Sequence, residues 1–304
     1  MRHLRFSLRG LIVLVLVIGG GMGRLVDMAR NARVQRVTVE AIKRAGGFVT
    51  YDRGWRDGLS SWNRESWYPA WLVDRLGVDY FGSVTEAMIG GRASDQDMAL
   101  LRHLTELQGL VVVSPYVTDT GIEQLNGLNR LESLTLVSTS ISNAGLPLLK
   151  ELRGLQKLSI GDTKLTDHGM AYLGNLHGLS VLNLANTEVS DAGLAHLKEL
   201  PNLRHLFLEG PKFTDLGLKY VGELTSLQML YLTTTNITDA GMTYLKGLSG
   251  LEVLSVEWTK VSDAGLEHLK GLSHLQVLHV QNTQVTVAGV QTLQKALSKL
   301  KISH

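Results

Sequence analysis

Residues 179–202 read LSVLNLANTEVSDAGLAHLKELPN and represent the 24-residue block that decides the fold. Eight such blocks follow one another without a gap over residues 107–298. The fourth position of every block is leucine, and the fifteenth position is always glycine. Self-similarity at a fixed period indicates a repeat protein built from one supersecondary unit. The blocks begin at Leu107, Leu131, Leu155, Leu179, Leu203, Leu227, Leu251 and Leu275.

The spacing of apolar residues changes inside each block. Leu182 and Leu184 occupy the fourth and sixth positions, which is the alternation of a strand with one buried face. Leu194, Leu197 and Leu200 then recur at every third position, which indicates a short helix with a buried stripe. A serine or threonine before this helix, usually followed by aspartate, is typical of a helix N-terminus. Each block therefore predicts one strand, one turn and one helix, and stacking of the blocks must supply a common core.

This pattern, L-x-x-L-x-L-x-x-T-x-[VI]-[ST]-D-A-G-L-x-x-L, resembles the leucine-rich repeat family. It is most similar to the 24-residue bacterial class, which includes GALA-type and F-box-associated repeats. The ninth position, where asparagine is usual, holds threonine or proline here, as at Thr187 and Pro211. The resemblance implies an α/β solenoid with parallel strands on the concave face and short helices on the convex face. It also implies a binding scaffold rather than an enzyme, without naming the ligand.

The sequence around the repeats divides into three further segments. Residues 31–106 are interpreted as an N-terminal cap that ends in a degenerate repeat over residues 83–106. In that repeat, Asp97 stands where the other blocks have glycine. The repeat register is lost at Ala296, so residues 299–304 are interpreted as a basic C-terminal cap or tail.

The first segment, residues 1–30, carries the pattern of a membrane signal. Three arginines precede an uncharged run over residues 10–23, as in secretory signals and signal anchors. The run is shorter than a full membrane span, which needs about 20 residues. The stretch from residue 6 to residue 26 has roughly that length, if the side chains of Arg9 and Arg24 extend outward to the membrane surface. We expect an uncleaved, single-pass transmembrane helix. A cleaved signal and a buried soluble helix are the alternatives, and arginines on both sides of the run leave its orientation open.

Composition excludes several classes of function. Lys and Arg number 30 against 28 Asp and Glu, a balance that lacks the electrostatic footprint of a nucleic-acid binder. The absence of cysteine excludes disulfides, thiolate catalysis and cysteine metal sites. The histidines lack the spacing of a metal motif. We therefore expect no nucleic-acid partner, no metal and no cofactor.

The candidate binding site lies on the strand face. In the geometry of this family, the third, fifth, seventh and eighth positions of each block point into the concave face. Blocks one to four carry small groups there, such as Ser133, Thr135 and Gly161, whereas blocks five to eight carry larger ones. Exposed aromatic residues are typical of interface hot spots, with cross-strand stacking as the alternative explanation. The candidate residues are His205, Phe207, Glu209, Met229, Tyr231, Glu257, Trp258 and His279.

The two carboxylates of this set raise the question of catalysis. Glu209 and Glu257 share a position two blocks apart, so they are expected about 10 Å from one another. That separation slightly exceeds the spacing of an inverting glycosidase pair. An open face offers nothing to raise the pKa of one of them, so we assign no catalytic residue.

The sequence is compatible with three candidate functions. The sequence predicts a membrane-tethered, bacterial-type scaffold that binds an unidentified protein through its concave face. Phe207, Tyr231 and Trp258 also suit a polysaccharide or cell-wall glycan, and the F-box-associated resemblance suggests a ubiquitin-ligase substrate adaptor. The adaptor is disfavoured because no separate helical domain fits within residues 31–82. Four tryptophans between residues 55 and 71 indicate either cap packing or an aromatic patch at a membrane or partner.

Overall fold

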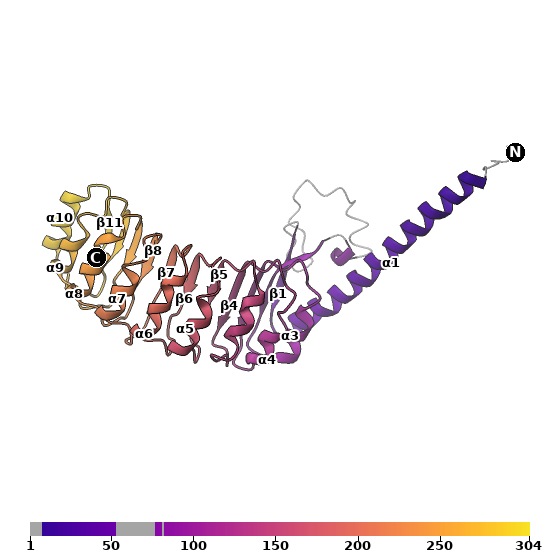
Figure 1. Cartoon of the computed structure of the whole chain (residues 1–304), viewed down its shortest axis with the longest axis horizontal. Helices are drawn as coiled ribbons and strands as arrows, with labels where there is room; N and C mark the ends of the chain where they lie inside the picture. Colours follow the sequence, from indigo (N-terminus) through magenta and orange to yellow (C-terminus); the bar gives the residue numbers. More distant parts are fainter. Residues whose placement is uncertain (1–7, 53–76, 81) are drawn as a thin grey trace.

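The computed structural model describes residues 8–52, 77–80 and 82–304, with side chains described from residue 26 onward. Within these residues, one eleven-stranded sheet runs along the molecule in the order β1 to β11. Figure 1 shows the sheet on the inner side of an arc and the short helices on its outer side. The parallel strands and short helices expected from the repeat pattern are therefore confirmed.

The strands are short and evenly spaced along the chain. They are β1 (Phe48–Tyr51), β2 (Val84–Ile89), β3 (Gly109–Val113), β4 (Ser133–Val137), β5 (Lys157–Ser159), β6 (Val181–Asn183), β7 (His205–Phe207), β8 (Met229–Tyr231), β9 (Val253–Ser255), β10 (Val277–His279) and β11 (Lys301–Ser303). β1 and β2 pair antiparallel, and the pairs from β2 to β11 are parallel.

The helices that follow the strands are also short. The α-helices are α1 (Leu8–Arg44), α3 (Asp95–Leu101), α4 (Asp119–Glu123), α5 (Asp167–Leu173), α6 (Asp191–Leu194), α7 (Asp215–Val221), α8 (Asp239–Met242), α9 (Asp263–Leu266) and α10 (Val287–Ala296). The 3-10 helices are η1 (Val78–Tyr80), η2 (Leu146–Glu151), η3 (Ala195–Glu199), η4 (Thr243–Gly247) and η5 (Glu267–Leu269). One block with its strand and helix is called a coil below, numbered one to eight from Leu107.

The core follows the 24-residue period. Leu206 of β7 lies opposite Leu182 and Leu230 in the sheet, so the leucines of the fourth position form one buried row. Leu184 and Leu194 are also buried and fill the space between sheet and helix. Each coil thus covers the apolar flank of its neighbour, which is how a small repeat obtains a core.

On the helical side, an aspartate ladder joins successive coils. Asp191 opens α6 and accepts two hydrogen bonds from Thr214 of the next coil, from the backbone N–H at 2.8 Å and from Oγ1 at 2.5 Å. In coil two, Asn143 makes the equivalent bridge to Thr166. The Thr214 hydroxyl also caps α7, as the sequence pattern predicts. The bridge between coils was not expected, because its partners lie 23 residues apart.

The glycine column makes room for this ladder. A Cβ at Gly193 would lie 2.5 Å from Oδ1 of Asp167 and 2.8 Å from Cγ1 of Val189. Glycine at this position therefore allows neighbouring coils to approach closely. Asp97 occupies this position in the degenerate repeat, where its carboxylate accepts the N–H of Ser94 at 2.9 Å and caps its own helix.

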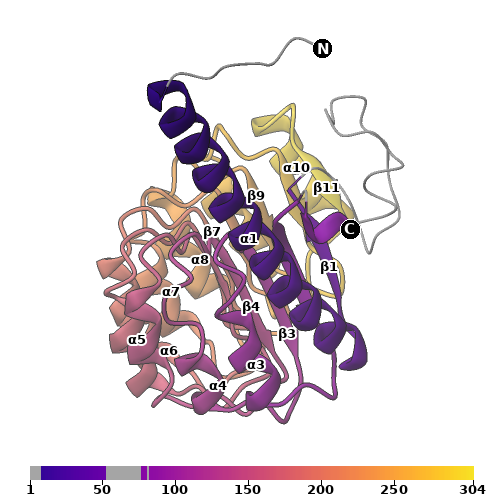
Figure 2. The same cartoon turned by 90° about the vertical axis from the view of Figure 1, so that its right-hand side faces the viewer.

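α1 packs against the first strands of the sheet (Figure 2). Val39 and Ile42 are buried in the same core as β1 and β2. Gln35 fixes the helix to the loop before β2, because its Nε2 donates to the carbonyl of Gly82 at 2.9 Å. The described C-terminal half of α1 is therefore an integral part of the cap.

The expected membrane signal lies in a part of the chain for which few side chains are described. Among the described residues, no helix is both long and apolar enough to cross a bilayer. The uncharged run at residues 10–23 has no described side chains, and the tryptophans between residues 55 and 71 also lie outside the described residues.

The C-terminal residues differ from expectation. β11 pairs in parallel with β10 and places Ile302 opposite Leu278, 24 positions later in the sequence. The backbone spacing of the repeat therefore continues beyond Ala296, although the leucine pattern fades. Leu300 is buried. It replaces the leucine that begins each block, although it lies one residue later than the 24-residue period predicts.

Candidate binding site on the strand face

An aromatic stack stands on the strand face of coils five and six. Phe207 and Tyr231 end β7 and β8 and lie opposite one another in the parallel register. Their ring centroids are 4.8 Å apart and the rings are inclined by 17°. Both side chains are half-buried and belong to the row that points away from the core leucines. The stack is therefore rigid, and part of its surface is open to solvent.

His205 and Met229 begin the same two strands and extend the stack on one side. Both are half-buried. Burial lowers the pKa of His205 below its usual value of 6.5, and the nearby Lys157 and Arg204 lower it further. This imidazole is therefore neutral at neutral pH and adds no charge to the stack.

Acceptor groups line the other side of the stack. Glu209 and Glu257 hold the seventh position of coils five and seven, with Thr233 between them in coil six. Neither carboxylate forms an ion pair with any residue that the structure describes. Glu257 Oε2 accepts from Oγ of the buried Ser255 at 3.2 Å.

Gln281 continues this row in coil eight. Its Oε1 atom is buried and has no hydrogen-bond partner among the described residues. A buried acceptor without a donor is uncommon in folded proteins. Ser255 was not among the expected site residues, although it holds the same fifth position as Phe207 and Tyr231.

Trp258 occupies the eighth position of coil seven, in the turn after β9. Its side chain is 60% exposed. Its φ of +59° lies in the left-handed region, which bulky residues rarely adopt. The same position adopts positive φ in other coils, where shorter side chains stand. These are Ser138, Asp162, Asn186, Gly210, Thr234 and Asn282.

The structure does not gather all expected residues into one cluster. His205, Phe207, Met229 and Tyr231 are neighbours on β7 and β8. Glu209 lies two residues after Phe207, just beyond the end of β7. Glu257 and Trp258 come two coils later, and His279 lies opposite Ser255 in β10. The site is therefore a strip across four coils, with an aromatic part and an acceptor part.

The earlier coils offer a different surface. In β4 to β6 most outward positions hold small or medium-sized uncharged side chains, namely Ser133, Thr135, Ser159, Val181 and Asn183, followed by Gly161 after β5. Lys157, which begins β5, is the charged side chain among them, and these strands carry no aromatic one. Among the described residues, no group of three or more histidine, aspartate or glutamate side chains is placed to hold a metal ion.

Part of the chain matches a known protein family. Residues 159–304 match the family described as leucine-rich repeat region. The repeats form a leucine-rich repeat solenoid. The match begins in coil three and includes the whole strip from His205 to Gln281.

Several solved structures are similar to this chain. Internalin C2 from Listeria monocytogenes is 25% identical, with 69% of this chain and 84% of that chain covered and a TM-score of 0.50. Another Listeria monocytogenes internalin is 19% identical over 71% and 72%, with a TM-score of 0.49. A leucine-rich repeat protein of Leptospira interrogans is 17% identical over 68% of each chain, with a TM-score of 0.43. No curated protein matches the chain in sequence.

Proposed function

We propose that this leucine-rich repeat protein is a membrane-tethered scaffold that binds a protein partner through the strip on its strand face. The Phe207–Tyr231 stack carries the proposal. It is an ordered aromatic surface outside the core, and such surfaces anchor protein interfaces. Repeat solenoids use this extended inner face for binding. The proposed activity is binding, without a catalytic step.

The acceptor part of the strip defines the chemistry of the partner. Glu209 and Glu257 present carboxylate oxygens, which are hydrogen-bond acceptors, and the described residues supply no cation to either of them. The Oε1 atom of Gln281 has no donor among the described residues. A guanidinium or ammonium group satisfies such acceptors with charge-assisted hydrogen bonds. Arginine also packs on aromatic faces. The partner therefore presents a basic side chain beside an apolar one.

The organisation of the chain completes the proposal. Residues 1–30 form a single-pass anchor, residues 31–106 a cap, residues 107–298 eight repeats and residues 299–304 a tail. The bacterial character and the membrane location both rest on the sequence pattern. After a high-salt wash, the full chain should stay with the membrane fraction, and its recovery in the soluble fraction would contradict the tether. A reporter fused after residue 304 then decides which side of the membrane the repeats occupy.

A pull-down with the full chain, followed by measurement of the Kd of the purified partner, tests the binding strip. Tyr231→Ala and Trp258→Ala should each weaken binding by about 2 kcal/mol, because truncation of an interface anchor typically has that effect. Ser133→Ala and Ser159→Ala on coils two and three should change it little. Equal affinity of all four variants would place the site elsewhere. Capture of a polysaccharide in place of a protein would favour the glycan hypothesis.

A further inference from the structure

The exposed face of α1 combines apolar and basic side chains. Val26 and Val37 are 64% and 50% exposed. At 3.6 residues per turn they lie about three turns apart, on the same side of the helix. Arg30 and Arg33 lie between them and are exposed as well. Arginine above an exposed apolar stretch is typical of the level at which a helix meets a membrane surface.

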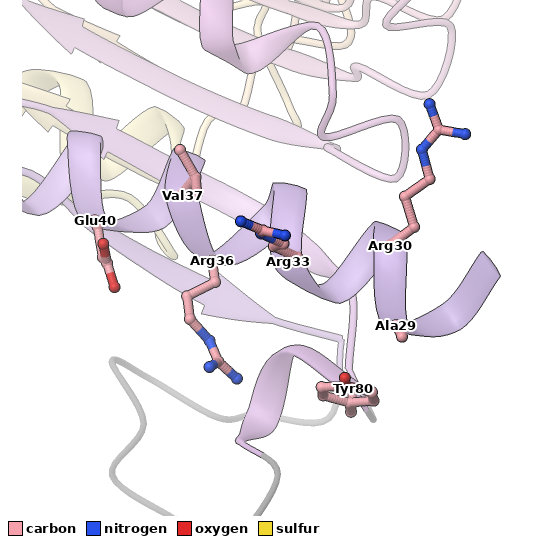
Figure 3. A pocket seen from close by; sticks show the side chains of 7 residues that line it. All are labelled: Ala29, Arg30, Arg33, Arg36, Val37, Glu40 and Tyr80. Atoms are coloured by element: carbon pink, nitrogen blue, oxygen red, sulfur yellow. The ribbon is translucent and has the colours of Figure 1, made fainter. Parts of the chain in front are cut away.

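A cavity of about 640 Å³ lies along this part of α1. In Figure 3, Arg36 is directed toward η1 and Arg30 extends from the opposite side of the helix. The arginines therefore spread around the helix. Arg36 forms an ion pair with Asp79, with Nε 3.3 Å from Oδ2. The residues that line the cavity are Ala29, Arg30, Arg33, Arg36, Val37, Glu40 and Tyr80.

Arg30 and Arg33 carry charges that the rest of the described chain does not neutralise. Neither has an ion pair or a hydrogen bond with a described residue. The residues from 26 to 44 include five basic and two acidic side chains, although the whole chain has a net charge of only +2. Positive charge is thus concentrated on α1, which favours an anionic partner.

The position of the two arginines identifies that partner. α1 is one helix from Leu8 to Arg44, so the uncharged run at residues 10–23 leads directly into this face. At about 1.5 Å per residue, Arg30 and Arg33 lie roughly 6 and 10 Å beyond Val26. If the bilayer ends near Val26, as the proposed tether requires, both lie within about one Debye length of its surface. We propose that Arg30 and Arg33 bind the phosphate groups of anionic phospholipids at that surface.

Native mass spectrometry of the full chain in non-ionic detergent tests this site. Micelles are doped with either phosphatidylglycerol or phosphatidylcholine, and bound lipids are counted for the wild type and for an Arg30→Gln/Arg33→Gln variant. The wild type should prefer phosphatidylglycerol, and the preference should fall about fivefold for each arginine removed. Arg92→Gln/Arg153→Gln is the matched control, because it removes two exposed arginines elsewhere and should keep the preference. Equal circular dichroism spectra establish that the variants are folded.

Three results would overturn the lipid site. These are equal binding of both lipids by the wild type, an unchanged preference in the α1 variant, and an equal loss in the control variant. Displacement of phosphatidylglycerol by inorganic phosphate would show that the arginines recognise free phosphate instead. The measurement in micelles does not depend on a transmembrane span. A chain that fractionates as soluble but still selects phosphatidylglycerol would therefore refute the tether and keep this site.

Discussion

The two sides of each coil differ in how they use the repeat. On the helical side, the aspartate, the glycine and the capping hydroxyl recur with few exceptions, because each contacts the neighbouring coil. On the strand side, the outward positions of coils one to four carry no aromatic side chain, whereas those of coils five to eight include Phe207, Tyr231 and Trp258. Positions that repeat are those required for stacking. Positions that vary are free of that requirement and are where a binding surface can develop.

The largest effect on this comparison is expected from Gly193→Leu. The new side chain would collide with Asp167 and Val189, so we expect a loss of about 3 kcal/mol in the free energy of unfolding through overpacking. Urea denaturation measures this loss. Gly271 is the control, because a Cβ there meets nothing within 4 Å, and Gly271→Ala should change stability little. If the two variants unfold alike, the glycine column is not required for stacking.

Removal of one step of the ladder should have a smaller effect. Asp191→Ala leaves the Thr214 N–H and hydroxyl without their acceptor and should lower the free energy of unfolding by about 2 kcal/mol. Asp191→Asn should lose much less, because Asn143 already makes the same bridge in coil two. Equal losses for both variants would mean that the carboxylate charge matters more than the bridge.

Acidic pH should weaken the last bridge of the ladder, which joins Asp263 to Thr286. The Thr286 backbone N–H and then its hydroxyl lower the pKa of Asp263 below its ordinary value of 3.8. A pKa lowered by folding stabilises the protein above the unfolded pKa, and this stability is lost as the pH falls through the folded pKa. The urea midpoint of the wild type should therefore fall more steeply below about pH 4 than that of Asp263→Asn. Parallel pH profiles would exclude this residue as a contributor.

The smallest change is expected on the strand side, from Trp258→Asn. Asparagine adopts the left-handed backbone at Asn186 and Asn282, so the variant should gain about 1 kcal/mol in stability by release of strain. At the same time it should weaken binding of the partner. Thermal melting measures the first effect and partner titration the second. A variant that is both less stable and fully active would show that Trp258 serves packing rather than recognition.

The sequence predicted the fold from its strongest signals and missed contacts that cross coils. Leucine spacing predicted the strands, and the serine or threonine before each helix was expected at the helix N-terminus, where Thr214 caps α7. The bridge from Thr214 to Asp191 was missed, because pattern analysis within one block does not show which side chains meet between blocks. β11 was missed for a related reason, since backbone pairing with β10 holds it in register without the usual leucines.

The candidate strip shows the same limit. Phe207 and Tyr231 were identified from their shared position, and the parallel register brings their rings together. The strain at Trp258 and the unpartnered Oε1 atom of Gln281 depend on backbone angles and burial, which residue types alone do not determine. The sequence therefore predicts which residues share the strand face, and the structure adds the contacts between them.

The aspartate ladder also bears on how the chain acquires and loses order. Every bridge joins residues 23 positions apart, so each coil is fastened only to the next one along the chain. Such a chain behaves like a row of linked units, in which order spreads from neighbour to neighbour. Coils near the ends have one neighbour fewer and open more readily than those in the middle. We therefore expect the slowest amide exchange in coils four and five. The aromatic stack of coils five and six adjoins this most protected region.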